Sequence, residues 1–155
     1  MNRKIFIIAL ITLILDQLTK IIISLSLTLN TSITIIPHFF YITFVTNPGA
    51  AWGILSNNLF FLILVTIIAA FIIYRFIYQF QTNYRNNLAF GLIIGGLLGN
   101  LIDRLFHGYV IDFLDFYLLN YDYPVFNLAD SAIVIGVILL IFAIMKGEDH
   151  HGIKS

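Results

Sequence analysis

The sequence predicts a membrane α-helical protein with four transmembrane helices, a small outward-facing β-sheet and an interfacial aromatic segment. Three observations support this fold class. The 155-residue chain is 60% hydrophobic and only 10% charged, whereas soluble domains are about half apolar and about a quarter charged. Its mean hydropathy is +0.97. Four apolar runs are close to the roughly 20 residues that a helix needs to cross a bilayer.

The predicted spans form a single domain, residues 1–155, and cover about 5–25, 59–80, 88–105 and 125–145. The first span follows Arg3 and Lys4, as a signal peptide would. It is long, however, and no small-x-small cleavage site follows it, so we interpret it as a retained span. The third span carries Gly91, Gly95 and Gly99. This spacing favours close approach of a neighbouring helix.

The basic residues predict the orientation of the spans. Six of the eight Lys and Arg residues fall at the N-terminus, in the middle loop or at the C-terminus: Arg3, Lys4, Arg75, Arg85, Lys146 and Lys154. The positive-inside rule makes these segments cytoplasmic. Both termini are therefore expected inside, and the segments 26–58 and 106–124 are expected outside.

The first outward segment contains SITIIPHFFYITFVTN, Ser32–Asn47, which is rich in β-branched and aromatic residues. This composition favours strands, and Pro37 should divide them into two short pieces. The second outward segment predicts an interfacial aromatic stretch. Its aromatic residues are Phe106, Tyr109, Phe113, Phe116, Tyr117, Tyr121 and Tyr123.

Polar side chains gather at the outer ends of the spans. They are Asp16, Lys20, Asn100, Asp103, Arg104, Asn127, Asp130 and Ser131, with Asp112 in the segment between. Polar groups in membrane helices are costly and usually face an interior or a cavity. Within each span their three- and four-residue spacing places them on one helix face. For Asp16–Lys20 and Asp103–Arg104, ion pairs that only hold the helices together remain an alternative.

Asp112 and Asp130 differ from the other acidic residues because neither has a cation three or four positions away. Two neighbouring carboxylates without cations share a proton, which provides one base and one acid. This is the chemistry of aspartic peptidases, which activate water directly. Asp115 and Asp122 are rival carboxylates, which we interpret as solvated interfacial charges.

Composition and spacing exclude some classes of function and are compatible with two others besides a peptidase. The chain has no Cys and no basic tract, so thiol chemistry is excluded and a nucleic-acid partner is not expected. A proton-coupled transporter would usually place its polar groups near the midplane. A metal-dependent lipid enzyme would use Asp103, Asp112 and Asp130 around Mg²⁺. His38 and His107 are isolated, so no metal or cofactor is predicted.

Five polar motifs, in this order and spacing, resemble those of the lipoprotein signal peptidases, also called signal peptidase II. They are DQLTK (Asp16–Lys20), NPGAAWG (Asn47–Gly53), GGLLGNLIDRL (Gly95–Leu105), YVIDFLDF (Tyr109–Phe116) and PVFNLADS (Pro124–Ser131). The resemblance covers about residues 5–145. One small departure is Trp52, which stands where Phe is more frequent in this family.

The resemblance implies a catalytic pair, Asp112 and Asp130. It also implies substrate-binding roles for Asn47, Gly49, Asn100, Arg104 and Asn127, and site-shaping roles for Asp16, Lys20 and Asp103. Asp115 lies close to the pair in sequence, and we hypothesise that its charge raises the pH optimum.

The implied reaction is removal of the signal peptide from diacylglyceryl-modified bacterial prolipoproteins, with cleavage on the N-terminal side of the lipidated Cys. The implied location is the bacterial cytoplasmic (inner) membrane, with the active site at the outer leaflet. The expected partners are these substrates and membrane lipids, and the protein is expected to function as a monomer without a cofactor.

Overall fold

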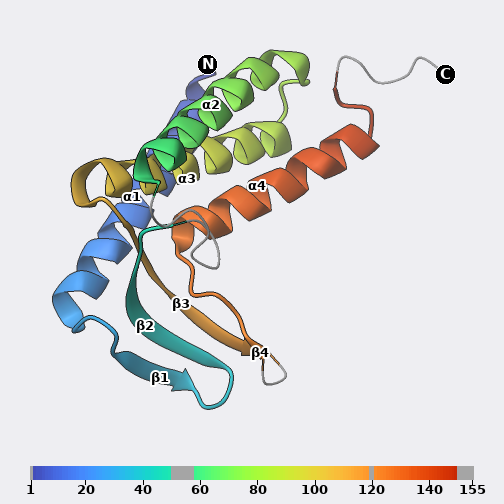
Figure 1. The fold of residues 1–155 in the computed structure, drawn as a ribbon. Helices are drawn as coiled ribbons and strands as arrows, with labels where there is room; N and C mark the ends of the chain where they lie inside the picture. The colour runs from blue at the N-terminus through green and yellow to red at the C-terminus, as the bar shows by residue number, and fades with distance from the viewer. Residues whose placement is uncertain (1, 50–57, 119–120, 150–155) are drawn as a thin grey trace.

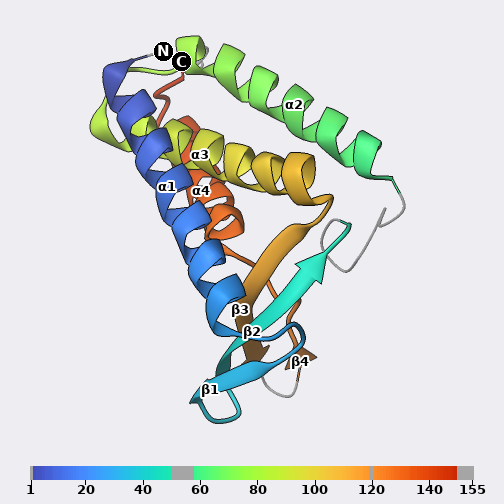
Figure 2. The ribbon, with the colours of Figure 1, turned by 90° about the vertical axis from the view of Figure 1, so that its left-hand side faces the viewer.

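In the computed structural model, described for residues 2–49, 58–118 and 121–149, four long helices lie at one end of a small sheet (Figure 1). All four are long and apolar enough to cross a membrane. They are α1 (Arg3–Ser26), α2 (Leu59–Phe76, continued by the short 3-10 helix η2, Ile77–Gln79), α3 (Tyr84–His107) and α4 (Leu128–Met145). The start of α1 and the end of α4 both lie away from the sheet (Figure 2). This arrangement agrees with the expectation that both termini are on one side.

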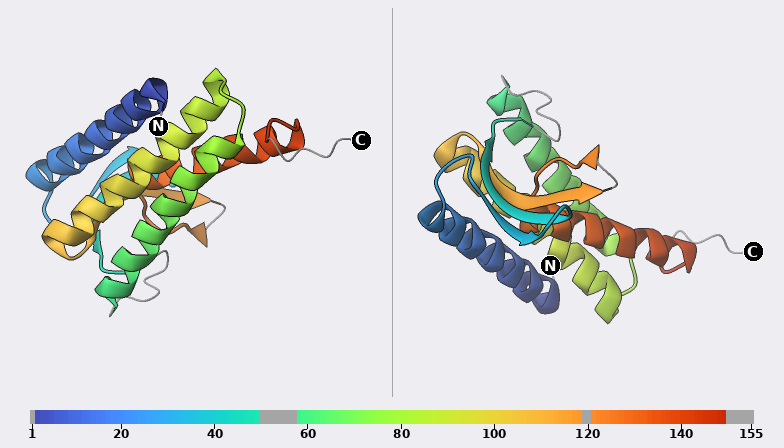
Figure 3. Two further views of the ribbon diagram at one scale, coloured as in Figure 1. Left: turned by 90° about the horizontal axis from the view of Figure 1, so that it is seen from above. Right: turned by 90° about the horizontal axis from the view of Figure 1, so that it is seen from below.

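Helix α3 is the centre of the helical part, with α1 and α4 packed against it (Figure 3). Gly91, Gly95 and Gly99 all face α1. A Cβ atom added at Gly95 would lie 2.6 Å from the carbonyl oxygen of Ala9, and one added at Gly99 would collide with the carboxylate of Asp16. The predicted tight packing at these glycines is confirmed, and it brings Asp16 against α3.

The sheet is antiparallel, with strand order β1-β2-β3-β4. Its strands are β1 (Ser32–Ile36), β2 (Phe40–Asn47), β3 (Val110–Leu118) and the two-residue β4 (Tyr121–Asp122). As predicted, Pro37 lies between the first two strands. The sheet is larger than predicted, because the second outward segment supplies β3 and β4. Stacking of Phe40 on Phe116, with ring centroids 4.5 Å apart, joins β2 to β3.

The fourth span begins at Leu128, three residues later than predicted. The backbone of Phe126 pairs with that of Leu114 on β3, with N–H···O distances of 3.0 and 2.7 Å, which keeps the chain extended up to that point. Asn127 then caps α4. Hydropathy does not reveal this boundary, because Val125 and Phe126 are as apolar as the helix that follows.

Candidate active site

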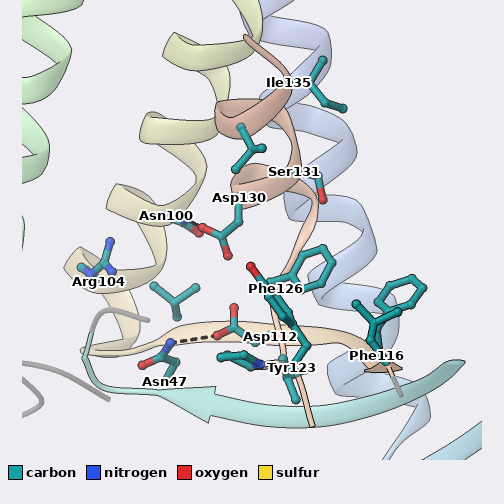
Figure 4. A pocket seen from close by; sticks show the side chains of 15 residues that line it. Asn47, Asn100, Arg104, Asp112, Phe116, Tyr123, Phe126, Asp130, Ser131 and Ile135 are labelled. Carbon is teal, nitrogen blue, oxygen red and sulfur yellow. Dashed lines mark hydrogen bonds between the residues drawn. The ribbon is translucent and has the colours of Figure 1, made fainter. Parts of the chain in front are cut away.

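A cavity of about 620 Å³ lies where the C-terminal end of α3 and the N-terminal end of α4 meet the sheet (Figure 4). Its polar residues come from four elements and are Asn47, Asn100, Arg104, Asp112, Asp130 and Ser131. The remaining wall is mostly apolar, with Phe116 and Phe126 at the sheet and Val134 and Ile135 on α4. The cavity therefore combines a small polar cluster with a large apolar surface.

Asp112 projects from β3 into this cavity and is only 2% exposed. The Asn47 amide donates to Oδ2 at 3.0 Å, and the Asn127 amide donates to Oδ1 at 2.7 Å. Burial, and then the negative charge of Asp130, raise the pKa of Asp112 to about 7, although the two amide hydrogen bonds act in the opposite direction. This carboxyl group therefore holds a proton near neutral pH more readily than an exposed Asp does.

Asp130 occupies the first turn of α4 because it completes a capping box with Asn127. The Asp130 N–H donates to Asn127 Oδ1 at 2.9 Å, and the Asn127 N–H donates to Asp130 Oδ2 at 3.3 Å. The helix N-terminus also favours a negative charge at this position. Figure 4 shows the Asp130 and Asp112 carboxyl groups pointing toward each other across the cavity.

Two asparagine amides connect the carboxyl groups. Asn100 Nδ2 donates to Asp130 Oδ1 at 2.7 Å, while Asn100 Oδ1 accepts from Asn127 Nδ2 at 3.1 Å and from Lys20 Nζ at 3.0 Å. An ammonium group can only donate, so Lys20 fixes the orientation of the Asn100 amide. That orientation directs the Asn100 NH₂ group to Asp130.

Lys20 is the centre of a buried ion triad. Its Nζ lies 2.8 Å from Asp16 Oδ2 and 2.8 Å from Asp103 Oδ2, and its side chain is only 2% exposed. The two carboxylates also accept backbone hydrogen bonds, at 2.9 Å from the Ala129 N–H and at 3.1 Å from the Ile111 N–H. The triad therefore connects α1 and α3 to the start of α4 and to β3. These last two elements carry the cavity carboxyl groups, Asp130 on α4 and Asp112 on β3.

The partner of Asp103 differs from the pairing that sequence neighbours suggested. Asp103 pairs with Lys20 rather than with the adjacent Arg104. Arg104 instead donates to the Gly49 carbonyl oxygen at 3.2 Å, and the Gly49 N–H donates to Asn47 Oδ1 at 2.9 Å. Arg104 Nε is buried without a hydrogen-bond partner in the described part of the chain. The Arg104 guanidinium group at the cavity wall therefore has an N–H donor that is not used within the described residues.

Comparison with known proteins agrees with this arrangement. The family model for signal peptidase (SPase) II matches residues 8–146, which is most of the chain. The chain belongs to the signal peptidase II family. A lipoprotein signal peptidase of Staphylococcus aureus (strain JH9) is 45% identical to it over 152 residues, covering 94% of this chain and 93% of that protein.

Two solved bacterial membrane enzyme structures, both obtained by the in meso method, share the fold. The structure at 2.3 Å resolution has a TM-score of 0.85 and 41% identity, covering 97% of this chain and 93% of that one. The structure at 1.9 Å resolution has a TM-score of 0.82 and 44% identity, covering 92% of each chain. The predicted fold class is therefore confirmed.

In this signal peptidase II chain, the residues singled out from the sequence lie in one connected region of hydrogen bonds and ion pairs. They are Asp16, Lys20, Asn47, Gly49, Asn100, Asp103, Arg104, Asp112, Asn127 and Asp130. Gln17 was missed, although its Nε2 donates to Asp103 Oδ1 at 2.9 Å. The sequence signal for Gln17 is its polar side chain inside an otherwise apolar span. Trp52 and Lys154 lie outside the described residues.

The interpretation of Asp115 as a solvated charge is wrong. Asp115 is 5% exposed, and one of its oxygens accepts a hydrogen bond from the Thr43 hydroxyl at 2.5 Å. The largest electrostatic influence on the Asp112 pKa comes from Asp130, and Lys20 acts in the opposite direction. The hypothesis that Asp115 raises the pH optimum stays a prediction, tested by the pH–rate profile of Asp115→Asn.

Within residues 2–49, 58–118 and 121–149, no group of three or more His, Cys, Asp or Glu side chains is placed to hold a metal ion. In this signal peptidase II chain the amide hydrogen bonds from Asn47, Asn100 and Asn127 surround the Asp112 and Asp130 carboxyl groups instead. Neutral donors of this kind suit carboxyl groups that exchange protons.

Proposed function

We propose that this chain removes the signal peptide from diacylglyceryl-modified bacterial prolipoproteins as a membrane aspartic endopeptidase, and that it cuts on the N-terminal side of the lipidated Cys. The observation that carries this proposal is the pair Asp112 and Asp130. The pair faces one cavity from two different elements, a strand and a helix, with amide groups as its nearest donors. Membership of the signal peptidase II family supports the substrate class.

In the proposed reaction the dyad carries one proton. The ionised carboxylate takes a proton from a water molecule, and the protonated carboxyl group donates its hydrogen bond to the scissile carbonyl oxygen. The water oxygen attacks the carbonyl carbon, and the tetrahedral intermediate then collapses with cleavage of the C–N bond. A dyad carboxyl group returns a proton to the leaving amine. No covalent intermediate and no metal enters these steps.

The other polar residues hold the substrate and the dyad in place. Asn47, Gly49 and Arg104 lie together at the cavity wall and are positioned to contact the substrate backbone. Asn100 and Asn127 orient the dyad carboxyl groups. The ion triad, Asp16, Lys20 and Asp103, holds Asn100 in place through the hydrogen bond from Lys20.

The apolar part of the cavity suits a signal peptide and acyl chains. Val134 and Ile135 line the cavity and are exposed on α4, where a lipid tail reaches them from the bilayer. We place the chain in the cytoplasmic membrane with both termini inside, the dyad at the outer leaflet and membrane lipids around it. We also infer that one copy is sufficient, because all the site residues discussed above belong to one chain.

The direct test is cleavage of a lipidated prolipoprotein by purified protein in the presence of EDTA. We expect a single cut before the lipidated Cys and a rate that EDTA does not change. Loss of activity in EDTA, with restoration by Mg²⁺, would instead support a metal-dependent lipid enzyme. Absence of cleavage, together with proton-coupled solute uptake in vesicles, would support a transporter.

The pH dependence of kcat/KM follows from the pKa of Asp112. Because this pKa is raised to about 7, the singly protonated dyad persists up to about that pH, and activity should fall above it as the second carboxyl group ionises. The Asn47 hydrogen bond lowers the pKa of Asp112, so Asn47→Ala should move the alkaline limb to higher pH while reducing the maximum. Gln79→Ala, at the helix end remote from the sheet, is the matched control. An alkaline limb that stays in place in Asn47→Ala would refute this assignment.

A further inference from the structure

A second pocket, of about 440 Å³, lies against a different side of the sheet from the dyad cavity. It is lined by Ser32, Thr34, His38, Tyr41, Asp115 and Tyr117. Strand β3 forms a wall of both spaces, because successive side chains of a strand point to opposite faces. Asp112, Phe116 and Leu118 line the dyad cavity, whereas Asp115 and Tyr117 line the second pocket.

Asp115 is the charged group of the second pocket. It is buried, and its Oδ2 accepts the Thr43 hydroxyl hydrogen. Its Oδ1 is buried with no hydrogen-bond partner among the described residues. A buried carboxylate oxygen without a donor is costly, so its presence points to a ligand that supplies a donor or a positive charge.

The hydroxyl groups around Asp115 present acceptors to the pocket. The Ser32 and Thr43 hydroxyl oxygens are 2.9 Å apart, and Thr43 gives its single hydrogen to Asp115. Ser32 must therefore be the donor to Thr43, and the lone pairs of the Ser32 oxygen remain available. The lining residues include no Lys and no Arg. His38 is the remaining lining residue that can carry a positive charge, and it forms no ion pair with Asp115. A carboxylate without an ion-pair partner matches a ligand with one positive charge.

The shape and the aromatic residues define the kind of cation. The rings of Tyr41 and Tyr117 pack edge to face with centroids 5.3 Å apart, and both line the pocket. Tyrosine rings next to a carboxylate favour an alkylammonium group, whose methylene stem packs on the rings while its charge lies near their faces. A divalent metal is a poorer match, because Ca²⁺ takes roughly six to eight oxygen ligands, usually including several carboxylates.

We propose that this pocket binds the side-chain ammonium group of a lysine in the mature segment of the substrate, on the C-terminal side of the cleavage site. The proposal rests on the proposed function. A chain that leaves the dyad cavity past Leu118 must turn around the end of β3 to reach Asp115. From Asp112 to Leu118 and back to Asp115 the path passes about nine strand positions, so at about 3.3 Å per extended residue it takes on the order of nine to twelve residues.

The test compares two lipidated precursors that differ only in having Lys or Gln at one position, scanned over the sixth to fourteenth residues after the lipidated Cys. We expect the wild type to cleave the Lys precursor with a kcat/KM about fivefold higher at one or two neighbouring positions. In Asp115→Asn this preference should disappear, so that the Lys and Gln precursors are cleaved with equal kcat/KM. Asp149→Asn, which removes the same charge at the opposite end of the molecule, should keep the preference.

A second variant tests the pocket without substituting Asp115. Thr34→Lys, on the exposed strand β1, places an ammonium group at the pocket and should remove the preference for the Lys precursor by occupying the site. Equal cleavage of both precursors by the wild type at every position would overturn the inference and leave the proposed function standing. A failure to cleave either precursor would overturn the proposed function itself. Equal cleavage combined with activation by phosphatidylethanolamine vesicles, lost in Asp115→Asn, would assign the pocket to a lipid headgroup and overturn the peptide assignment.

Discussion

Asp112→Asn and Asp130→Asn should each lower kcat for cleavage of a lipidated precursor by about a thousandfold or more, because each removes one member of the acid–base pair. The substitution changes one atom type and keeps the shape of the side chain. It also keeps an oxygen that can accept the amide hydrogen bonds from Asn127 or Asn100. What the variant loses is the ability to take up or release a proton. The measurement is single-turnover cleavage by purified protein.

Two controls separate lost chemistry from lost structure. Asp149→Asn changes the same residue type far from the cavity and should cleave at the wild-type rate. The thermal unfolding midpoints of the dyad variants in detergent should stay close to that of the wild type, because Asn removes the cost of burying an ionisable carboxyl group but leaves one of the two hydrogen-bond donors at that group unpaired. If either dyad variant keeps more than about a tenth of wild-type kcat, the acid–base assignment fails.

The parts of this structure that were predicted are those that local sequence determines. Apolar runs of sufficient length located the four spans, and the residues around Pro37 located the first two strands. The start of α4 was misplaced because the extended backbone of Phe126 depends on pairing with Leu114, a partner that no local pattern names. The pairing of β2 with β3 is similarly a contact between distant segments.

The site shows the same division between local and distant determinants. The absence of nearby cations singled out Asp112 and Asp130 directly from spacing. The partner of Asp103 was not accessible in that way, since Arg104 is adjacent in sequence whereas Lys20 lies on another helix. The aromatic, outward segment around Asp115 suggested a solvated charge, but the pairing of Asp115 in β3 with Tyr41 in β2 places it inside the sheet and buries it. Burial depends on the sheet register, which the sequence alone did not reveal.

Lys20→Met should have the largest effect on stability, at about 3–5 kcal/mol of unfolding free energy, because it leaves two buried carboxylates without their cation. Asp16 and Asp103 each lie 2.8 Å from the Lys20 ammonium nitrogen in the folded protein. The substitution also removes the Lys20 hydrogen bond to the Asn100 oxygen, so that only the Asn127 amide orients Asn100 and the dyad is held less firmly. The free energy is measured by reversible unfolding in mixed micelles, alongside kcat.

Arg85→Met is the matched control, because it also removes the cation of an ion pair. Arg85 pairs with Glu148 at the helix end away from the sheet, where the side chains are 25% and 20% exposed. The hydrogen bond from Arg85 holds the pKa of the Glu148 carboxyl group below its usual range, but solvent screens a pair at that surface. The loss of unfolding free energy in Arg85→Met should therefore be much smaller than the loss in Lys20→Met. Adding Asp103→Asn to Lys20→Met removes one of the stranded charges and should recover part of the stability without restoring kcat. Equal losses of unfolding free energy in Lys20→Met and Arg85→Met, or no recovery of stability in the double variant, would contradict the stabilising role assigned to the buried triad. An unchanged kcat in Lys20→Met would show that the triad does not hold the dyad in place.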